Sequence, residues 1–259
     1  MHSWMRLPSA ELERSSFLNQ TERCKRFARR EEPAQGVCPI CKGIGKLPSR
    51  TEDGLVRITD CACVAEQVAR QRLVMSGIPE HLARQCTFES FGADDPALKK
   101  MKDTAMAYAE DPKGWLYLGG ATGCGKTHLA VAAAVALLGR GYPVTYMSFS
   151  TEIGALKRVG GPVEAQDRRL RELQSCPVLL LDDLLHAADR PSAAEVNVAF
   201  QILSQRYDRC LSTILTTRWA YSQLSAFSDA LGTRIYQSSR DSGCYIREDS
   251  RFNYRLRRD

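Results

Sequence analysis

The sequence lacks any run of about 18 apolar residues, so we expect no membrane-spanning helix. Its opening residues, MHSWMRLPSAELERSS, contain no apolar segment of the kind found in secretory signals. It also contains no internal repeat and no low-complexity tract. These absences argue against a membrane protein and a secreted protein, and they favour a cytoplasmic location.

What the sequence does contain is typical of a folded chain. Of its 259 residues, 44% are hydrophobic and 25% are charged, a balance that disordered chains do not show. The length allows one large domain, or one domain plus a small appendage. The formal net charge of +6 permits a nucleic-acid partner, but a basic solvated surface would explain it equally well.

Three segments differ in composition. Residues 1–35 are polar and charged, and we expect them to form a helix or a mobile arm. Residues 36–67 carry clustered cysteines among Gly and Pro, which favours a small zinc-binding module. In residues 68–259 strands and helices alternate, which predicts an α/β domain with a parallel central sheet covered by helices on both faces. The expected strands are 115–118, 144–149, 177–181 and 213–217, and the expected helices are 127–138, 164–174 and 192–209.

Residues 120–127 read GATGCGKT and match the phosphate-binding pattern G-x-x-x-x-G-K-S/T. The glycines let backbone N–H groups curl around a β-phosphate, and the following helix points its positive end at it. Lys126 is expected to contact the β- and γ-phosphates, and the Thr127 hydroxyl to bind Mg²⁺. The motif follows an expected strand and opens an expected helix, so we predict an ATP site. The expected nucleotide-binding residues are Gly120, Ala121, Thr122, Gly123, Cys124, Gly125, Lys126, Thr127, His128 and Thr217.

Two acids, Asp182 and Asp183, end the apolar strand at residues 177–181. We expect Asp182 to face the loop and to hold Mg²⁺ and its waters, and Asp183 to orient or deprotonate the attacking water. A helix N-cap or a surface turn is the alternative for each. The next strand ends in Thr216, Thr217 and Arg218, and a polar residue there, taken as Thr217, is expected to sense the γ-phosphate unless it only forms a turn.

Four of the ten cysteines lie close together in the sequence. Disulfides are not expected in a reducing compartment, which leaves metal binding or burial as free thiols. Four thiolates suit tetrahedral Zn²⁺ and leave no open position for catalysis, so the zinc would be structural. Gly43 and Gly45 would let backbone amides turn toward the sulfurs. The expected ligands are Cys38, Cys41, Cys61 and Cys63.

In combination these motifs resemble the helicase-loader branch of AAA+ ATPases, the DnaC/IstB-like group. The matching segments are CPICKGIGK with CAC, Ile78-Pro79, TFESF, GATGCGKTHLA, VLLLDDL, TILTTR and GTRI, within about residues 37–255. The resemblance implies that the zinc module grips the replicative DNA helicase and that the ATPase domain binds single-stranded DNA when ATP is present. It also implies an ATP-dependent homo-oligomer, in which Arg234 reaches into a neighbour's ATP site and stabilises charge on the γ-phosphate. A surface or salt-bridged arginine is the alternative for Arg234.

The resulting expectation is an ATPase that delivers the helicase onto single-stranded DNA. An IstB-type ATPase helper of DNA transposition is the alternative, against which the cysteine module argues. A small-molecule kinase would need an acceptor-binding lid, and none is evident. A non-hydrolysing DNA-binding adaptor is the remaining alternative, should Asp183 be inert.

The stretch between Phe149 and Cys176 is basic. Positive charges on one face would suit DNA phosphates, whereas charges spread around a helix would indicate a solvated surface. Residues 168, 169 and 171 cannot all share one helix face, so part of this stretch is expected to be solvated. Its basic residues are Lys157, Arg158, Arg168, Arg169 and Arg171.

Overall fold

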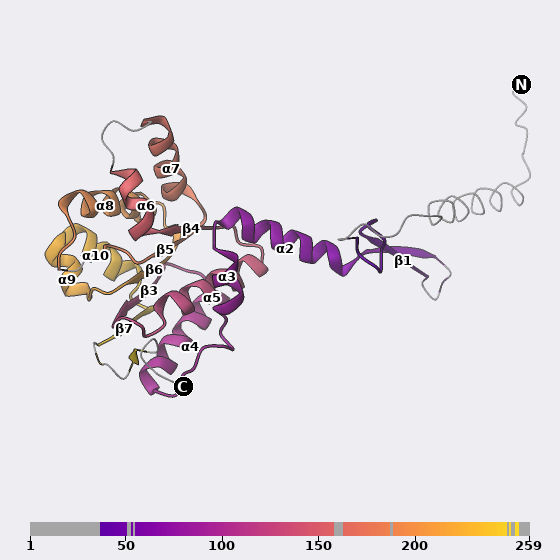
Figure 1. The fold of residues 1–259 in the computed structure, drawn as a ribbon, viewed down its shortest axis with the longest axis horizontal. Coiled ribbons are helices and arrows are strands. Elements are labelled where there is room, and N and C mark those ends of the chain that lie inside the picture. Colours follow the sequence, from indigo (N-terminus) through magenta and orange to yellow (C-terminus); the bar gives the residue numbers. More distant parts are fainter. Residues whose placement is uncertain are drawn as a thin grey trace, which may run out of the picture. The chain divides into compact units, whose positions relative to one another are not determined.

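The structure is a computed structural model that describes residues 37–50, 53, 55–157, 163–186, 189–247, 249 and 252–253. The arm expected at residues 1–35 lies outside the described residues. The chain divides into two compact units, one ending at Glu66 and the other beginning at Gln67 (Figure 1). No helix in the described part of the chain has the length and apolar character needed to cross a bilayer.

The N-terminal unit contains an antiparallel hairpin of β1 (Lys46–Arg50) and β2 (Val56–Asp60), followed by the start of α2 (Ala62–Ser76). Its apolar side chains are largely in solvent: Ile44 is 74% exposed and Ile58 is 66% exposed. A two-stranded hairpin without a covered face is marginal in water. The stability of this unit must therefore come from something other than a hydrophobic core.

The C-terminal unit is built on a five-stranded sheet with the order β4-β5-β6-β3-β7, in which every neighbouring pair is parallel. This confirms the predicted fold class. β3 and β5 are buried along their whole length, because continuous apolar runs such as WLYL and VLLL suit a sheet covered on both faces. The strands are β3 (Trp115–Gly120), β4 (Val144–Ser148), β5 (Val178–Asp182), β6 (Ser212–Thr217) and β7 (Gly243–Ile246).

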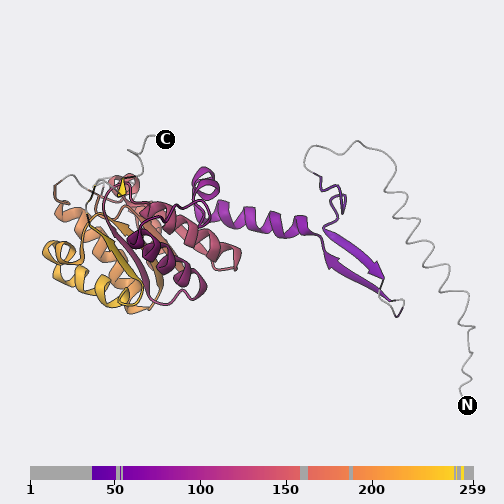
Figure 2. The same cartoon turned by 90° about the horizontal axis from the view of Figure 1, so that it is seen from below.

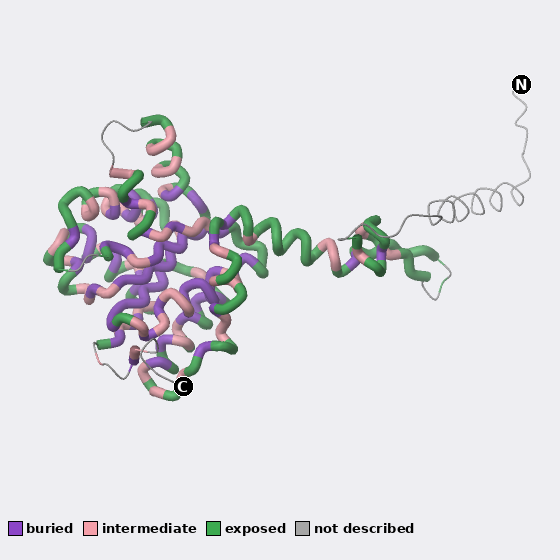
Figure 3. Tube along the Cα trace, in the orientation of Figure 1, coloured by how far each residue is buried: buried purple, intermediate pink, exposed green. Residues whose placement is uncertain are grey.

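Helices cover both faces of this sheet, as Figures 1 and 2 show. Successive strand residues point to opposite faces, so Leu116 and Leu118 join a core with α4 and α5, whereas Tyr117 joins a core with α8 and α10. Figure 3 shows the sheet strands as the most buried part of this unit. The helices are α3 (Glu80–Gln85), α4 (Pro96–Glu110), α5 (Lys126–Gly139), α6 (Phe149–Leu156), α7 (Val163–Ser175), α8 (Ala193–Asp208), α9 (Tyr221–Phe227) and α10 (Asp229–Ser238).

Each strand and helix expected from the sequence is present, with boundaries that differ by at most two residues. The strand expected at residues 144–149 ends at Ser148, and Phe149 is the first residue of α6 with its side chain buried. Ser192 and Glu195 form a capping box at the start of α8: the Ser192 hydroxyl accepts the Glu195 N–H, and the Glu195 carboxylate accepts the Ser192 N–H.

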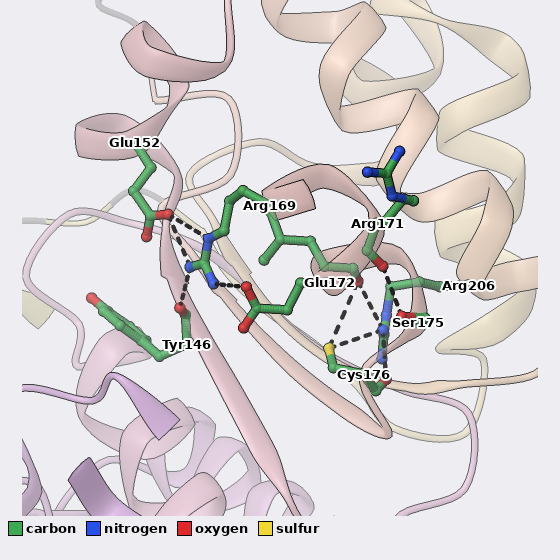
Figure 4. A network of polar contacts seen from close by, with 9 residues as sticks. Tyr146, Glu152, Arg169, Arg171, Glu172, Ser175, Cys176 and Arg206 are labelled. Atoms are coloured by element: carbon green, nitrogen blue, oxygen red, sulfur yellow. Dashed lines mark hydrogen bonds and ion pairs between the residues drawn. The ribbon is translucent and has the colours of Figure 1, made fainter. Parts of the chain in front are cut away.

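A fully buried arginine ties α7 and α8 to the sheet. The Arg206 guanidinium donates to the carbonyl oxygens of Leu173 and Cys176, at 2.9 and 2.8 Å, and to that of Ser212. It also donates to the Thr213 hydroxyl at 2.9 Å. These contacts, part of which Figure 4 shows, fix the start of β6 and the end of α7.

Candidate functional site

The loop between β3 and α5 has the backbone of a phosphate-binding loop. Gly120, Gly123 and Gly125 have φ angles of 114°, 80° and 87°, in the region that favours glycine. Lys126 is 8% exposed, and its ammonium donates to the carbonyl oxygens of Gly120 at 2.8 Å and Ala121 at 2.7 Å. The Lys126 side chain thus lies along the loop and contacts its first two residues. Of the other loop positions, Cys124 is buried and Thr122 is exposed.

Two side chains from distant parts of the chain pack against this loop. A Cβ atom at Gly125 would overlap the Phe91 ring, and a Cβ atom at Gly123 would overlap the Asn253 side-chain amide. Phe91 itself is 5% exposed. These contacts explain why both loop positions need glycine, and they add Phe91 and Asn253 to the residues around the predicted ATP site.

His128 joins the segment before α4 to the first turn of α5. Its Nε2 atom lies 2.8 Å from the Thr87 carbonyl oxygen and 3.2 Å from the Ser90 hydroxyl. Its ring meets the Phe91 ring edge-on, with 5.4 Å between centroids. The TFESF segment therefore forms a wall beside the loop, and His128 holds that wall in place.

The predicted magnesium ligands Thr127 and Asp182 lie together. The Thr127 hydroxyl donates to Asp182 Oδ1 at 2.9 Å, and the Thr216 hydroxyl donates to the same oxygen at 2.6 Å. Neighbouring oxygen ligands on an octahedral Mg²⁺ ion are about 2.9 Å apart, so the Thr127 and Asp182 oxygens fit this ion. Burial raises the pKa of Asp182, while the hydrogen bond from Thr216 lowers it. A divalent cation would favour the ionised form of this buried carboxylate.

Asp183 begins a turn that is fastened to β6. Its φ angle is 55°, an uncommon value that Asp tolerates, and its N–H donates to the Thr216 hydroxyl at 2.8 Å. Thr217 points to the other face, where its hydroxyl donates to the Leu184 carbonyl oxygen at 2.9 Å. The structure thus brings Thr216 against Asp182 and leaves Thr217 holding the turn. Because side chains alternate along β6, only one of the two threonines can face Asp182, and the structure shows that it is Thr216.

Arg234 lies on α10, on the opposite face of the sheet from α5. Its guanidinium stands over the rings of Phe200 and Tyr207 on α8, at 5.2 and 5.5 Å, and donates to the Ala230 carbonyl oxygen at 3.0 Å. Its Nε atom is buried and has no hydrogen-bond partner among the described residues. The structure therefore does not bring Arg234 to the phosphate-binding loop of its own chain.

The basic stretch is partly neutralised by ion pairs. Arg169 pairs with Glu152 at 2.9 Å and Glu172 at 3.0 Å, and it donates to the Tyr146 carbonyl oxygen. Lys157 pairs with Glu195 at 3.1 Å. Figure 4 shows the Arg171 side chain turned away from the Arg169 contacts. Of the five basic residues, Arg168 and Arg171 are exposed on α7, and Arg158 lies outside the described residues.

The four cysteine sulfurs of the N-terminal unit all lie within 4.8 Å of one another. Cys38 Sγ is 3.8 Å from Cys61 Sγ, and Cys41 Sγ is 3.4 Å from Cys63 Sγ. Sulfurs around a tetrahedral Zn²⁺ ion, with Zn–S bonds of about 2.3 Å, are about 3.8 Å apart, so the four residues fit zinc.

The backbone of this cluster also favours thiolates. The Gly45 N–H donates to Cys41 Sγ at 3.2 Å, and this contact lowers the pKa of Cys41 to about 6. Contact with the Cys41 sulfur raises the pKa of Cys63, because neighbouring sulfurs do not both ionise readily without a cation between them. The predicted turn of glycine amides toward the sulfurs is present at Gly45.

Residues 61–235 match the family model described as IstB-like ATP binding protein. The chain belongs to this family. The match includes the phosphate-binding loop, both acids and Arg234, and it begins at the second pair of cysteines. The shared domain is therefore the ATP-binding domain, and Cys38 and Cys41 lie before it.

The names of similar proteins refer to a phage-like element, to an insertion sequence and to a helicase loader. The chain is 30% identical over 243 residues to phage-like element PBSX protein XkdC of Bacillus subtilis, covering 87% of this chain and 90% of that protein. It is 29% identical over 148 residues to a putative insertion sequence ATP-binding protein of Sinorhizobium fredii, covering 54% and 48%. Its fold is similar to the crystal structure of the DnaC helicase loader, with a TM-score of 0.52 at 21% identity, covering 66% of this chain and all of that one.

Proposed function

We propose that this protein is an ATPase that loads a replicative DNA helicase onto single-stranded DNA in the cytoplasm. The observation that carries the proposal is the pairing of two features in one chain. One is an AAA+ site in which Lys126, Thr127 and Asp182 converge, and the other is a separate cysteine-bearing unit with exposed apolar side chains. The first suits a nucleotide switch, and the second suits a docking module.

In the ATPase unit, backbone amides of residues 120–125 would hold the β-phosphate, and Lys126 would shift from the loop carbonyls to the β- and γ-phosphates. Thr127 and Asp182 would hold Mg²⁺, which when bound supplies charge neutralisation on the phosphates. Asp183, whose N–H donates to the Thr216 hydroxyl, would orient the attacking water or accept its proton. Phe91 and Asn253 would keep the loop in its binding conformation.

The arginine needed for hydrolysis would come from a neighbouring protomer. Arg234 is on the face away from its own loop, and its buried Nε is unsatisfied in the described part of one protomer. If the Arg234 side chain reached the γ-phosphate bound by a neighbouring protomer, its guanidinium would gain an anionic partner. ATP would then favour assembly, and hydrolysis would favour release.

In the N-terminal unit, Cys38, Cys41, Cys61 and Cys63 would hold a structural Zn²⁺ ion. The helicase would bind to the surface that this metal organises, because the exposed apolar residues of the hairpin have no covering layer among the described residues of the unit. This division favours a helicase loader over a transposition helper. The helper remains the alternative, supported by the insertion-sequence relative, which matches about half of the chain.

The test is co-purification of the full chain with a candidate replicative helicase. Wild type should retain the helicase, and the Cys38→Ser, Cys41→Ser double variant should lose it while still binding a fluorescent ATP analogue. A Cys210→Ser variant is a matched control, since Cys210 is exposed, belongs to the other unit and is not part of the cluster. Stable binding to a transposase instead, with no helicase retained, would favour the transposition helper.

A further inference from the structure

The described part of the basic stretch does not offer DNA a free positive surface. Two of the five basic residues of that stretch, Lys157 and Arg169, are held by carboxylates of their own chain. Arg168 and Arg171 share the exposed face of α7 with the acids Glu164 and Asp167, which offset their charge. A strand of DNA phosphates would gain little from such a face.

A different surface combines positive charge with aromatic rings. A cavity of about 270 Å³ opens beside the carboxyl ends of β6 and β7 and is lined by Arg218, Trp219, Gln223, Tyr245 and Arg247. A second cavity of about 580 Å³ borders the other side of α9, with Tyr221, Ser222, Ser225, Tyr236, Gln237 and Arg240 in its lining. Among the described residues that line the two cavities there is no carboxylate and no aliphatic side chain.

Among the rings in this surface, Tyr236 is exposed, Tyr221 and Tyr245 are partly buried, and Trp219 is buried. Tyr236 is 52% exposed and meets the Tyr221 ring edge-on at 5.4 Å. Tyr221 is itself stacked on Tyr117 at 4.1 Å, and its hydroxyl lies 2.9 Å from the Ser239 hydroxyl. Rigid rings with arginines beside them are the arrangement by which proteins bind single strands without reading sequence.

The geometry points to single-stranded nucleic acid as the occupant of this surface, with phosphates at Arg218, Arg247 and Arg240 and a base stacked on Tyr236. This inference rests on the proposed binding of single-stranded DNA and gives it a location. A protein partner would normally bury an apolar centre, and the described lining has none to offer apart from aromatic rings. The charge and the hydroxyl groups instead complement a polyanion.

The same surface adjoins the nucleotide site through the sheet. β6 and β7 flank β3, so that Thr217 and Tyr245 both lie opposite Gly119, immediately before the phosphate-binding loop. Arg218 follows Thr216 by two residues, and the Thr216 hydroxyl contacts the magnesium carboxylate Asp182. Through this connection we expect occupation of the magnesium site to alter the end of β6, and with it binding at this surface.

The experiment measures binding of a fluorescent oligothymidylate to the full chain by anisotropy, with a non-hydrolysable ATP analogue and Mg²⁺, across a salt series. Arg247→Gln and Arg240→Gln should each weaken binding and lower the slope of log affinity against log salt by about 0.7. Tyr236→Ala should weaken binding about 5- to 150-fold, and Tyr236→Phe should preserve it. The matched controls Arg168→Gln and Arg171→Gln on α7 should leave affinity and slope unchanged.

The possible failures are distinguishable. If wild type binds the oligonucleotide but loses it only with the α7 variants, this surface is wrong and the proposed function stands. If wild type binds no oligonucleotide with the analogue present, both are overturned. If Arg240→Gln and Arg247→Gln keep oligonucleotide affinity but lose self-association in sedimentation, the surface is a contact between protomers, and the inference fails. Thermal melts of each variant show whether it is folded.

Discussion

The two units of this protein are each stabilised by a different kind of interaction. The hairpin unit leaves Ile44, Ile58 and Leu55 mostly in solvent and gathers four sulfurs within 4.8 Å. The C-terminal unit buries two apolar layers on a parallel sheet, and its polar residues form closed networks around Asp182 and Arg206. The first unit should therefore respond to loss of a metal, and the second to loss of buried contacts, each without the other.

The largest expected effect is the unfolding of one unit while the other stays folded. Removal of zinc by a chelator should unfold the hairpin unit, because structural zinc contributes on the order of 10 kcal/mol to small folds of this kind. Hydrogen exchange should then show β1 and β2 unprotected while α5 stays protected. Metal analysis should find about one zinc per chain before chelation. A hairpin that stays protected without metal would show that the unit has another source of stability.

The next effect concerns hydrolysis and leaves both units folded. Arg234→Gln should lower ATP turnover, by up to 10³–10⁵-fold if it matches the best-studied arginines that act on a neighbour's nucleotide. Lys126→Ala should lose nucleotide binding, because its ammonium serves the loop and the phosphates. Mixing the two variants should restore part of the activity, since one supplies a sound pocket and the other a sound arginine.

The control for this mixing experiment is each variant alone at the same total concentration. If wild type is active and self-associates while the mixture recovers nothing, Arg234 does not act on a neighbour. Its contacts with Phe200 and Tyr207 would then be its whole role. Zinc content should be the same in all samples, as the comparison of the units requires.

Local sequence patterns predict only those parts of the site that are contiguous along the chain. The loop around Lys126 and the pair Asp182 and Asp183 are local patterns, and the structure brings Thr127 and Asp182 together. Phe91 and Asn253 meet the loop from far along the chain, so no local pattern marks them.

Other features depended on details that only the folded chain displays. Thr216 and Thr217 differ only in which face of β6 they occupy, and the TTR ending does not state the register. The sequence does not reveal that Arg169 is neutralised, because its ion pair with Glu152 forms only when α6 packs against α7. Strand and helix types followed from apolar runs and capping residues, whereas the end of β4 at Ser148 depended on Phe149 entering the core.

A smaller effect tests the buried network of the ATPase unit. Arg206→Ala should lower the free energy of unfolding of this unit by about 3 to 5 kcal/mol, because several buried carbonyl groups lose their donor at once. Arg209→Ala, at the exposed end of the same helix, is the matched control and should change it by no more than about 0.5 kcal/mol. Urea unfolding followed by tryptophan fluorescence measures both, because Trp115 and Trp219 are buried in this unit. An Arg206→Ala midpoint equal to wild type would show that water replaces the lost contacts.

The smallest expected effect exposes a conflict between stability and function at Asp182. Burial raises the pKa of this carboxyl in the folded protein, so the stability linked to its proton is present at low pH and lost as the pH rises through the folded-state pKa. At neutral pH without nucleotide the buried carboxylate should destabilise the unit, and Asp182→Asn should raise the free energy of unfolding by about 1 kcal/mol. The amide oxygen can still accept from Thr127 and Thr216, so the gain reflects the lost charge.

The same variant should lose magnesium-dependent hydrolysis, and its stability advantage should shrink as the pH falls. Asp208→Asn, on an exposed carboxylate of α8, is the control and should change neither property. An Asp182→Asn protein less stable than wild type at neutral pH would mean that the carboxylate is stabilised by its two hydroxyl donors more than burial costs it, and the metal would then not be needed to hold it ionised.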